Sequence, residues 1–283
     1  MASLSHPPRP AAGFTLTELA IVLFVVALLI SGMLMPLSAQ QDVRARQETE
    51  RVLAEAKEAV IGFAIANERL PCPASATSSG QESFCTNATG ACGAAIVAPA
   101  AMPAHGRCSN AHDGFLPAAT LGFVPIDTSG YAYDGWKTSD TNRLRYAITD
   151  HTRTAATQCV AGSDIYPFTC TKGMKEIYSV SASSDLQICS TGTGVTGGGT
   201  AAAACAANMS LATDAVAVIY SLGKNYVTGG AGSDETHNPN AQATVAADRL
   251  FVSASPSPSF DDQLTWVARG TLFSRLVTAG RLP

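Results

Sequence analysis

The chain opens with a long apolar run that contains a single acidic residue. From Phe14 to Leu37 nearly every side chain is hydrophobic, and Glu18 interrupts the run near its start. At about 1.5 Å per residue, a helix of this length crosses a hydrocarbon core of roughly 30 Å. An ionised carboxylate in lipid costs about 2.5–3.5 kcal/mol on insertion scales, so an acid at this place indicates a function and a partner. We predict a membrane helix over residues 14–37 in which Glu18 has a specific role.

The following segment, residues 38–67, predicts an amphipathic helix that continues the first. Charged side chains alternate there with apolar ones that recur at three- and four-residue steps: Val52, Leu53, Ala56, Val60 and Phe63. We expect this apolar stripe to dock a globular domain. Pro36 lies at the junction of the two segments, where it is expected to kink or locally unwind the helix.

Residues 68–283 predict a globular, β-rich domain. The helix must end at the Pro71-Cys72-Pro73 sequence. Residues 143–148 alternate as a strand does, with Leu144, Tyr146 and Ile148 on one face and Arg143, Arg145 and Ala147 on the other. Further strands are expected over 175–182, 214–223 and 248–255, and a strand that runs into a short helix is expected over 264–280. The predicted fold is α+β, with one long N-terminal helix packed on an antiparallel sheet and loops stapled by disulfides.

Composition and charge place this domain outside the cytosol. Charged residues make up 14% of the chain and the net charge is −4, with no lysine or arginine cluster, so nucleic acid is not an expected partner. The eight cysteines contain no C-x-x-C spacing, which indicates disulfides in an oxidising compartment. Their pairing cannot be deduced, although we expect the first four to pair among themselves and the last four likewise: Cys72, Cys85, Cys92, Cys108, and then Cys159, Cys170, Cys189, Cys205.

The sequence "GFTLTELAIVL", from Gly13 to Leu23, resembles the signature shared by type IV pilins and type II secretion pseudopilins. The resemblance implies a polar leader, residues 1–13, that prepilin peptidase removes after Gly13 on the cytoplasmic side of the inner membrane. The same enzyme then methylates the new amino terminus at Phe14. It also implies that Glu18, at the fifth mature position, pairs with the positive amino terminus of a mature chain during assembly. The alternative is a secretory signal cleaved near Ala39, which would leave a Sec-exported, disulfide-rich adhesin.

A second, looser resemblance to pseudopilins lies in the domain. In that family an aspartate and a tryptophan precede a strand that ends in Arg-Tyr, and Asp134, Trp136, Arg145 and Tyr146 match this order. A large mature chain favours a minor pilin or pseudopilin over the main filament subunit. The implied partners are other subunits, prepilin peptidase and an inner-membrane assembly platform, with the domain in the periplasm and later in a pilus or pseudopilus.

No motif predicts an enzyme. His105 and His112 flank Cys108, but a disulfide partner for this cysteine is favoured over a metal. The glycines at 192, 194 and 197 match G-x-G-x-x-G without the strand that a dinucleotide site requires. Four late carboxylates leave two interpretations open: Asp234, Glu235, Asp261 and Asp262. They resemble the C-terminal loop in which major pseudopilins hold calcium, or they belong to a solvated turn with Asp262 near a helix start. No other cofactor is expected.

Overall fold

The computed structural model describes residues 13, 15–136, 142–150, 153–154, 164–177, 184, 186–196, 204–225, 234–238, 249–257 and 259–282. Within these ranges, only the backbone is described at 31–38, 153–154, 164–165 and 176. The chain divides into two compact units, residues 1–44 and residues 45–283.

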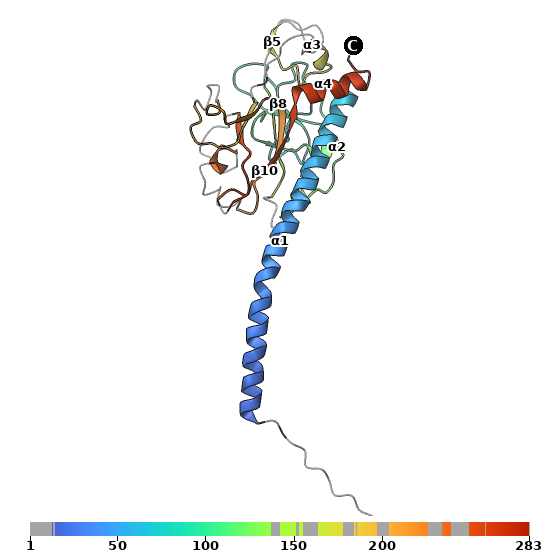
Figure 1. The fold of residues 1–283 in the computed structure, drawn as a ribbon. Helices are drawn as coiled ribbons and strands as arrows, with labels where there is room; N and C mark the ends of the chain where they lie inside the picture. The colour runs from blue at the N-terminus through green and yellow to red at the C-terminus, as the bar shows by residue number, and fades with distance from the viewer. Residues whose placement is uncertain are drawn as a thin grey trace, which may run out of the picture. The chain divides into compact units, whose positions relative to one another are not determined.

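The first unit contains the N-terminal part of helix α1, which runs from Leu16 to Asn67 (Figure 1). The helix continues through Pro36, so the unwinding predicted there is wrong. A proline inside a helix removes one backbone hydrogen bond, and the neighbouring turns hold the helical backbone across that gap. A search of the described residues found no helix with an apolar stretch long enough to cross a membrane.

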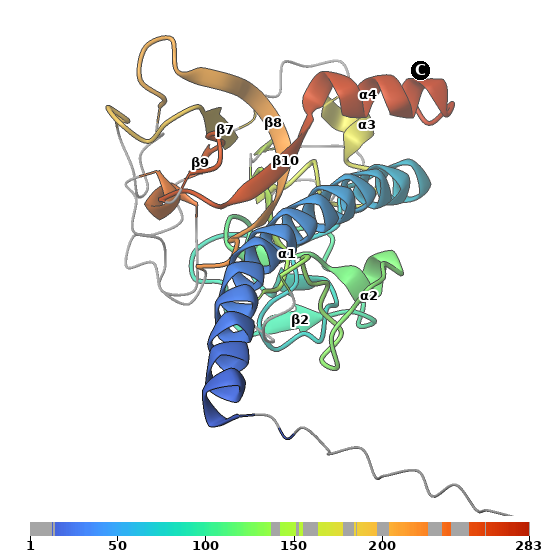
Figure 2. The same ribbon diagram turned by 60° about the horizontal axis from the view of Figure 1, so that its bottom comes forward.

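In the second unit, the C-terminal part of α1 supplies one side of the main core. The predicted stripe is buried at Val52, Leu53, Ala56 and Val60, whereas Phe63 is half-buried. The core continues into the sheet and into the last helix through these buried side chains: Leu144, Tyr146, Ile148, Val216, Ile219, Val267, Leu272 and Leu276. Figure 2 shows α1 lying across strand β10 and beside α4. Burial of these side chains explains why residues 45–67 are amphipathic.

The main sheet has the strand order β3–β4–β8–β7–β9, and β10 pairs with β8 outside this path. Its strands are Gly114–Phe115 (β3), Arg145–Ile148 (β4), Leu186–Cys189 (β7), Ser210–Ser221 (β8), Leu250–Val252 (β9) and Gln263–Ala268 (β10). Two small ladders pair Ser83–Cys85 (β1) with Ala95–Val97 (β2) and Arg153–Thr154 (β5) with Asp164–Ile165 (β6). The remaining helices are Ala118–Leu121 (α2), Met174–Ile177 (α3), the 3₁₀ turn Glu235–His237 (η2) and Arg269–Thr278 (α4).

The sheet is not purely antiparallel, which corrects the predicted fold. Strand β9 pairs parallel to β7, whereas β4, β7 and β10 all pair antiparallel to β8. The reason is topological. After the antiparallel pair β7–β8, the chain emerges at the end where β7 began, so a strand that returns along the outer edge of β7 runs in the same direction as β7.

Several local predictions match the structure, and one is wrong. Strands β4, β8 and β9 and the β10–α4 pair fall where alternation predicted them. In place of a strand from residue 175, the described part of this segment is the short helix α3. Met174 and Ile177 are both buried there, and a three-residue spacing places two side chains on one face of a helical turn. Strand β7 was not predicted, because four residues between loops carry too short a pattern.

Disulfides fasten the loops of the domain. The described bonds join Cys72 to Cys108, Cys85 to Cys92 and Cys189 to Cys205, each within one of the two groups of four. Cys170 is also in a disulfide, and Cys159 lies outside the described residues. The bond from Cys72 to Cys108 closes a loop of low regular structure directly after α1. A covalent link of this kind limits the conformations of the unfolded chain more than it adds contacts to the folded one.

Candidate functional site

The first candidate site is the start of α1, in the first unit. Gly13 is exposed, and Phe14 lies outside the described residues. Glu18 lies in the first turn, where its Oε2 accepts hydrogen bonds from the backbone N–H of Thr15 at 2.9 Å and from the Thr15 hydroxyl at 2.9 Å. The Glu18 N–H donates in turn to Thr15 Oγ1 at 3.3 Å. This reciprocal pattern is a capping box, which satisfies backbone donors at a helix start.

Glu18 therefore has a partner within its own chain before any cleavage. Thr15 was not among the predicted site residues, although the T-x-x-E spacing ahead of an apolar run is a recognised sign of a capping box. No described contact tests the predicted pairing of Glu18 with an amino terminus. Cleavage after Gly13 would place a new charged amine on Phe14, one position before Thr15, whose hydroxyl now donates to the carboxylate.

The second candidate site gathers three carboxylates at one end of β8 and β10. Glu235, Asp261 and Asp262 each offer an oxygen, and these oxygens lie within 4.8 Å of one another. Asp234, the fourth predicted member, points elsewhere and accepts hydrogen bonds from the Thr191 hydroxyl and the Gly192 N–H. We call Glu235, Asp261 and Asp262 the carboxylate trio.

Backbone turns and amide side chains position the trio. Asp261 Oδ2 accepts hydrogen bonds from the N–H groups of Lys224 (2.9 Å) and Asn225 (3.3 Å), just after β8. Gly223 makes this approach possible, since its φ is +63° and an added Cβ would lie 2.4 Å from Asp261 Oδ1. The Asn225 side-chain amide donates to both oxygens of Glu235, at 3.2 and 3.0 Å.

Asp262 lies at the start of β10, not at the helix start that the solvated-turn interpretation expected. It is 6% exposed, and its Oδ2 accepts a hydrogen bond from the Asn238 side chain at 2.8 Å. The same asparagine also donates to Val252 O and accepts from Val252 N–H, so its amide is held by the backbone of the last residue of β9. Neither asparagine had a sequence signal that could have identified it.

The trio concentrates negative charge in a partly desolvated place. Burial raises the pKa of Asp262 well above its ordinary value and raises the pKa of Glu235 as well, and repulsion from Asp261 adds to both shifts. Asp261 Oδ1 is buried and has no hydrogen-bond partner among the described residues. Three convergent carboxylates with an unsatisfied oxygen form a donor set that suits a hard cation such as Ca²⁺.

The Asp134–Trp136 segment has a structural role in the domain. Asp134 is buried and accepts hydrogen bonds from the Ser221 hydroxyl at 2.5 Å and the Trp136 N–H at 2.9 Å. Gly135 N–H donates to Thr49 Oγ1 of α1 at 3.0 Å. An added Cβ on Gly135 would lie 2.1 Å from Ala45 O, so only glycine allows this close approach to the helix. The segment fastens the loop before β4 to residues 45–49 of α1.

The histidines beside Cys108 do not form a metal site in the described structure. Cys108 is bonded to Cys72, as the sequence favoured. His105 Nδ1 accepts the Arg107 N–H at 3.0 Å, and burial lowers the His105 pKa. His112 Nε2 lies 3.6 Å from Asp150. Of the G-x-G-x-x-G glycines, Gly192 donates to Asp234 as above, and Gly197 lies outside the described residues.

Comparison with known proteins gives one match. Residues 8–34 match the family described as the prokaryotic N-terminal methylation motif. No curated protein and no solved structure matches the chain. The matched range contains Gly13, Phe14 and Glu18, so the segment identified from its sequence is a prepilin-type amino terminus of the type IV pilin kind.

Proposed function

We propose, from the premise that this chain is a type IV pilin-like protein with a prepilin-type amino terminus, that it is a minor filament subunit. In this proposal it is a minor pilin or pseudopilin of a type IV pilus or a type II secretion filament. Residues 14–37 hold it in the inner membrane until assembly, with the domain in the periplasm. Its role is structural rather than catalytic.

The match over residues 8–34 carries the proposal, and the start of α1 gives it a physical basis. Glu18 is the acidic residue of the first turn, where its carboxylate is hydrogen-bonded to Thr15. When subunits pack, an amino terminus freed at Phe14 replaces or joins Thr15 as the partner of this carboxylate. The cost of burying Glu18 among apolar helices is then offset by an ion pair.

Mass spectrometry of the mature amino terminus tests this function. We expect a chain that begins with methylated Phe14 when the protein is made together with a prepilin peptidase. A chain that begins near Gln40 would overturn the proposal in favour of the exported adhesin. Glu18→Ala should leave cleavage intact and impair incorporation into filaments, whereas Glu55→Ala, an exposed acid further along α1, should leave both intact.

We also propose that the carboxylate trio holds a calcium ion. The support is the convergence of three oxygens within 4.8 Å, together with a buried Asp261 oxygen, Oδ1, that has no hydrogen-bond partner among the described residues. Glu235, Asp261 and Asp262 would be the ligands, and the ion would neutralise their repulsion. A bound ion would thereby join η2 to the start of β10, two segments far apart in the chain.

Terbium luminescence and calcium calorimetry on the full chain test this site. We expect one saturable site that Asp261→Asn abolishes and that Asp214→Asn, an exposed change in β8, leaves unchanged. Equal binding by these two variants would show that the ion sits elsewhere. Absence of saturable binding by the unaltered chain would remove the calcium proposal and leave the filament proposal standing.

A further inference from the structure

Strand β10 lies at the border of the main sheet and pairs along one edge. In the central strand β8, the carbonyl of Val216 accepts a hydrogen bond from Thr149 N–H, just beyond β4. Backbone groups of successive residues in a strand point to opposite edges. The even-numbered residues of β8 therefore bond toward β4, and the odd-numbered ones bond toward β10.

This register fixes which groups of β10 are free. Gln263, Thr265 and Val267 stand opposite odd-numbered residues of β8 and form its ladder. The N–H and C=O groups of Leu264 and Trp266 consequently point away from β8, and the described part of the chain offers them no hydrogen-bond partner. An open strand edge of this kind is a template for pairing with another extended chain.

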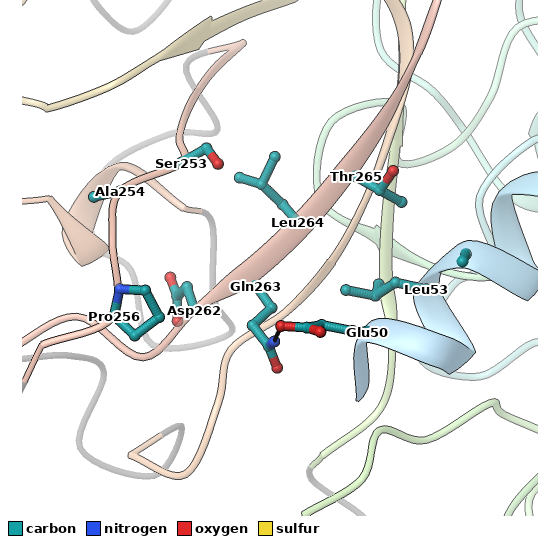
Figure 3. Close-up of a pocket in the computed structure, with 10 residues that line it drawn as sticks. Glu50, Leu53, Ser253, Ala254, Pro256, Asp262, Gln263, Leu264 and Thr265 are labelled. Atoms are coloured by element: carbon teal, nitrogen blue, oxygen red, sulfur yellow. Dashed lines mark hydrogen bonds between the residues drawn. The ribbon is translucent and has the colours of Figure 1, made fainter. Parts of the chain in front are cut away.

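A groove with a volume of about 270 Å³ runs beside this open edge (Figure 3). Glu50 and Leu53 of α1 form one wall, and the segment 253–256 after β9 forms the other. That opposite wall contains Pro256, which has no N–H. The wall segment therefore lacks a donor that a regular ladder with β10 would need. The groove is therefore an open slot between a strand edge and two walls.

The polar atoms at the helix side of the slot are hydrogen-bond acceptors. The Gln263 amide nitrogen already donates to Arg46 O (3.4 Å) and to Glu50 Oε1 (3.3 Å). The Gln263 Oε1 atom is buried and has no hydrogen-bond partner within the described part of the chain. Glu50 is an exposed carboxylate beside it. An unsatisfied acceptor next to a negative charge favours a ligand that brings a positively charged donor.

We propose that the open edge of β10 binds an extended segment of a partner protein that carries a lysine or arginine. The backbone of this segment pairs with the free groups of Leu264 and Trp266, so that the guest becomes an added strand of the sheet. Its cationic side chain reaches the exposed Glu50 carboxylate, beside Gln263 at the end of the slot. The site lies in the domain, away from the N-terminal segment on which the filament proposal rests.

The test uses the full chain in detergent micelles and blocked eight-residue peptides of alternating threonine and valine. One peptide carries a central lysine, and its analogue carries glutamate at the same place. We expect saturable binding of the lysine peptide, roughly tenfold or more tighter than the analogue, with slower hydrogen exchange at the Leu264 and Trp266 amides. Glu50→Gln should remove most of this preference for lysine.

A pair of variants at one position isolates the strand edge. Leu264→Pro deletes an N–H that points away from β8, whereas Leu264→Ala shortens the same side chain and keeps the N–H. We expect the proline variant to lose peptide binding and the alanine variant to retain it within about threefold, with circular dichroism confirming that both fold.

Equal binding by the proline and alanine variants would overturn edge pairing. Equal binding of the lysine and glutamate peptides, or no saturable binding to the unaltered chain, would overturn the assigned ligand. Concentration-dependent protection of the two amides without peptide would assign the edge to a second copy of this chain instead. None of these results bears on the mature amino terminus, so the filament proposal stands or falls separately.

Discussion

The buried ion pair between Arg69 and Glu82 provides the sharpest test of how the domain is held to the end of α1. The two side chains are 12% and 4% exposed, and two hydrogen bonds join them at 2.6 and 2.9 Å. Glu82 Oε2 also accepts the Cys72 N–H at 2.8 Å. The Arg69 guanidinium lies 4.9 Å from the centre of the Phe63 ring. The perturbation is Glu82→Ala.

The expected loss follows from what the substitution leaves behind. A buried guanidinium loses its counter-charge, and the buried Cys72 N–H loses its acceptor. Breaking one side of a buried ion pair costs about 3–5 kcal/mol, and an unsatisfied buried N–H costs about 1–3 kcal/mol. The two costs overlap, because the alanine leaves space for water to reach both groups, so we expect a total of about 3–5 kcal/mol.

The assay is equilibrium unfolding of the full chain under non-reducing conditions, followed by near-ultraviolet circular dichroism. For a domain of this size the loss corresponds to a fall in Tm of roughly 6–20 °C. The matched control is Arg51→Ala, which removes exposed ion pairs to Glu48 and to Glu55. Exposed pairs contribute little to stability, so this control should unfold close to the unaltered protein.

The double variant Arg69→Met with Glu82→Gln separates charge from packing. It removes both charges and keeps an acceptor for Cys72, so it should be more stable than Glu82→Ala by more than about 1 kcal/mol. If Glu82→Ala costs less than about 1 kcal/mol, the value typical of an exposed pair, the pair does not hold this junction. If the double variant is as unstable as the single one, the cost comes from lost packing rather than from the unpaired charge.

Three further predictions concern the domain. Asp134→Ala should lower the free energy of unfolding by about 2–3 kcal/mol in urea titrations, because the buried Ser221 hydroxyl and the half-buried Trp136 N–H lose a charged acceptor; Asp134→Asn should lose less, and an unchanged midpoint would contradict the role of this carboxylate. Burial raises the folded-state pKa values of Glu235 and Asp262, so the folded chain binds more protons than the unfolded one above about pH 4, and stability in EDTA should fall as the pH rises through the raised values. A Tm in EDTA that rises over this pH range would contradict the effect of the raised pKa values. A Tm that calcium leaves unchanged near neutral pH would contradict calcium binding by these carboxylates. Gly223→Ala should weaken terbium binding and stability more than Gly122→Ala does, because both have φ +63° but only the first meets a carboxylate; equal effects would show that backbone strain alone matters.

The parts of the fold that the sequence predicted are those with local, repeated patterns. The period of three and four residues identified the buried stripe of α1, and the alternation from Leu144 to Ile148 identified both faces of β4: Tyr146 joins the core with α1, and Ala147 joins the cluster on the opposite face. The methylation motif was also local, since Gly13, Phe14 and Glu18 fall within a few residues.

The parts that the sequence did not predict depend on contacts between distant segments. Asp261 precedes β10 and meets Glu235 of the 3₁₀ turn η2, 26 positions earlier, and no pattern near either residue expresses that meeting. Asp234 was predicted to join them because it is adjacent to Glu235 in the sequence. Its carboxylate instead accepts a hydrogen bond from the Gly192 N–H. The parallel partner of β7 and the open edge of β10 likewise follow from topology, which periodicity alone does not encode.

The last helix has a consequence for the order in which the domain can form. Leu272 and Leu276 of α4 are fully buried in a core that also contains Val52, which lies more than 200 residues earlier in the sequence. Strand β10, just before α4, pairs with the central strand β8. A chain emerging from a ribosome or a translocation channel therefore lacks one layer of its core until residues 263–278 are free. Until then the apolar side of α1 is exposed to proteases and chaperones, and removal of these residues would leave a persistent folding intermediate rather than a slightly smaller domain.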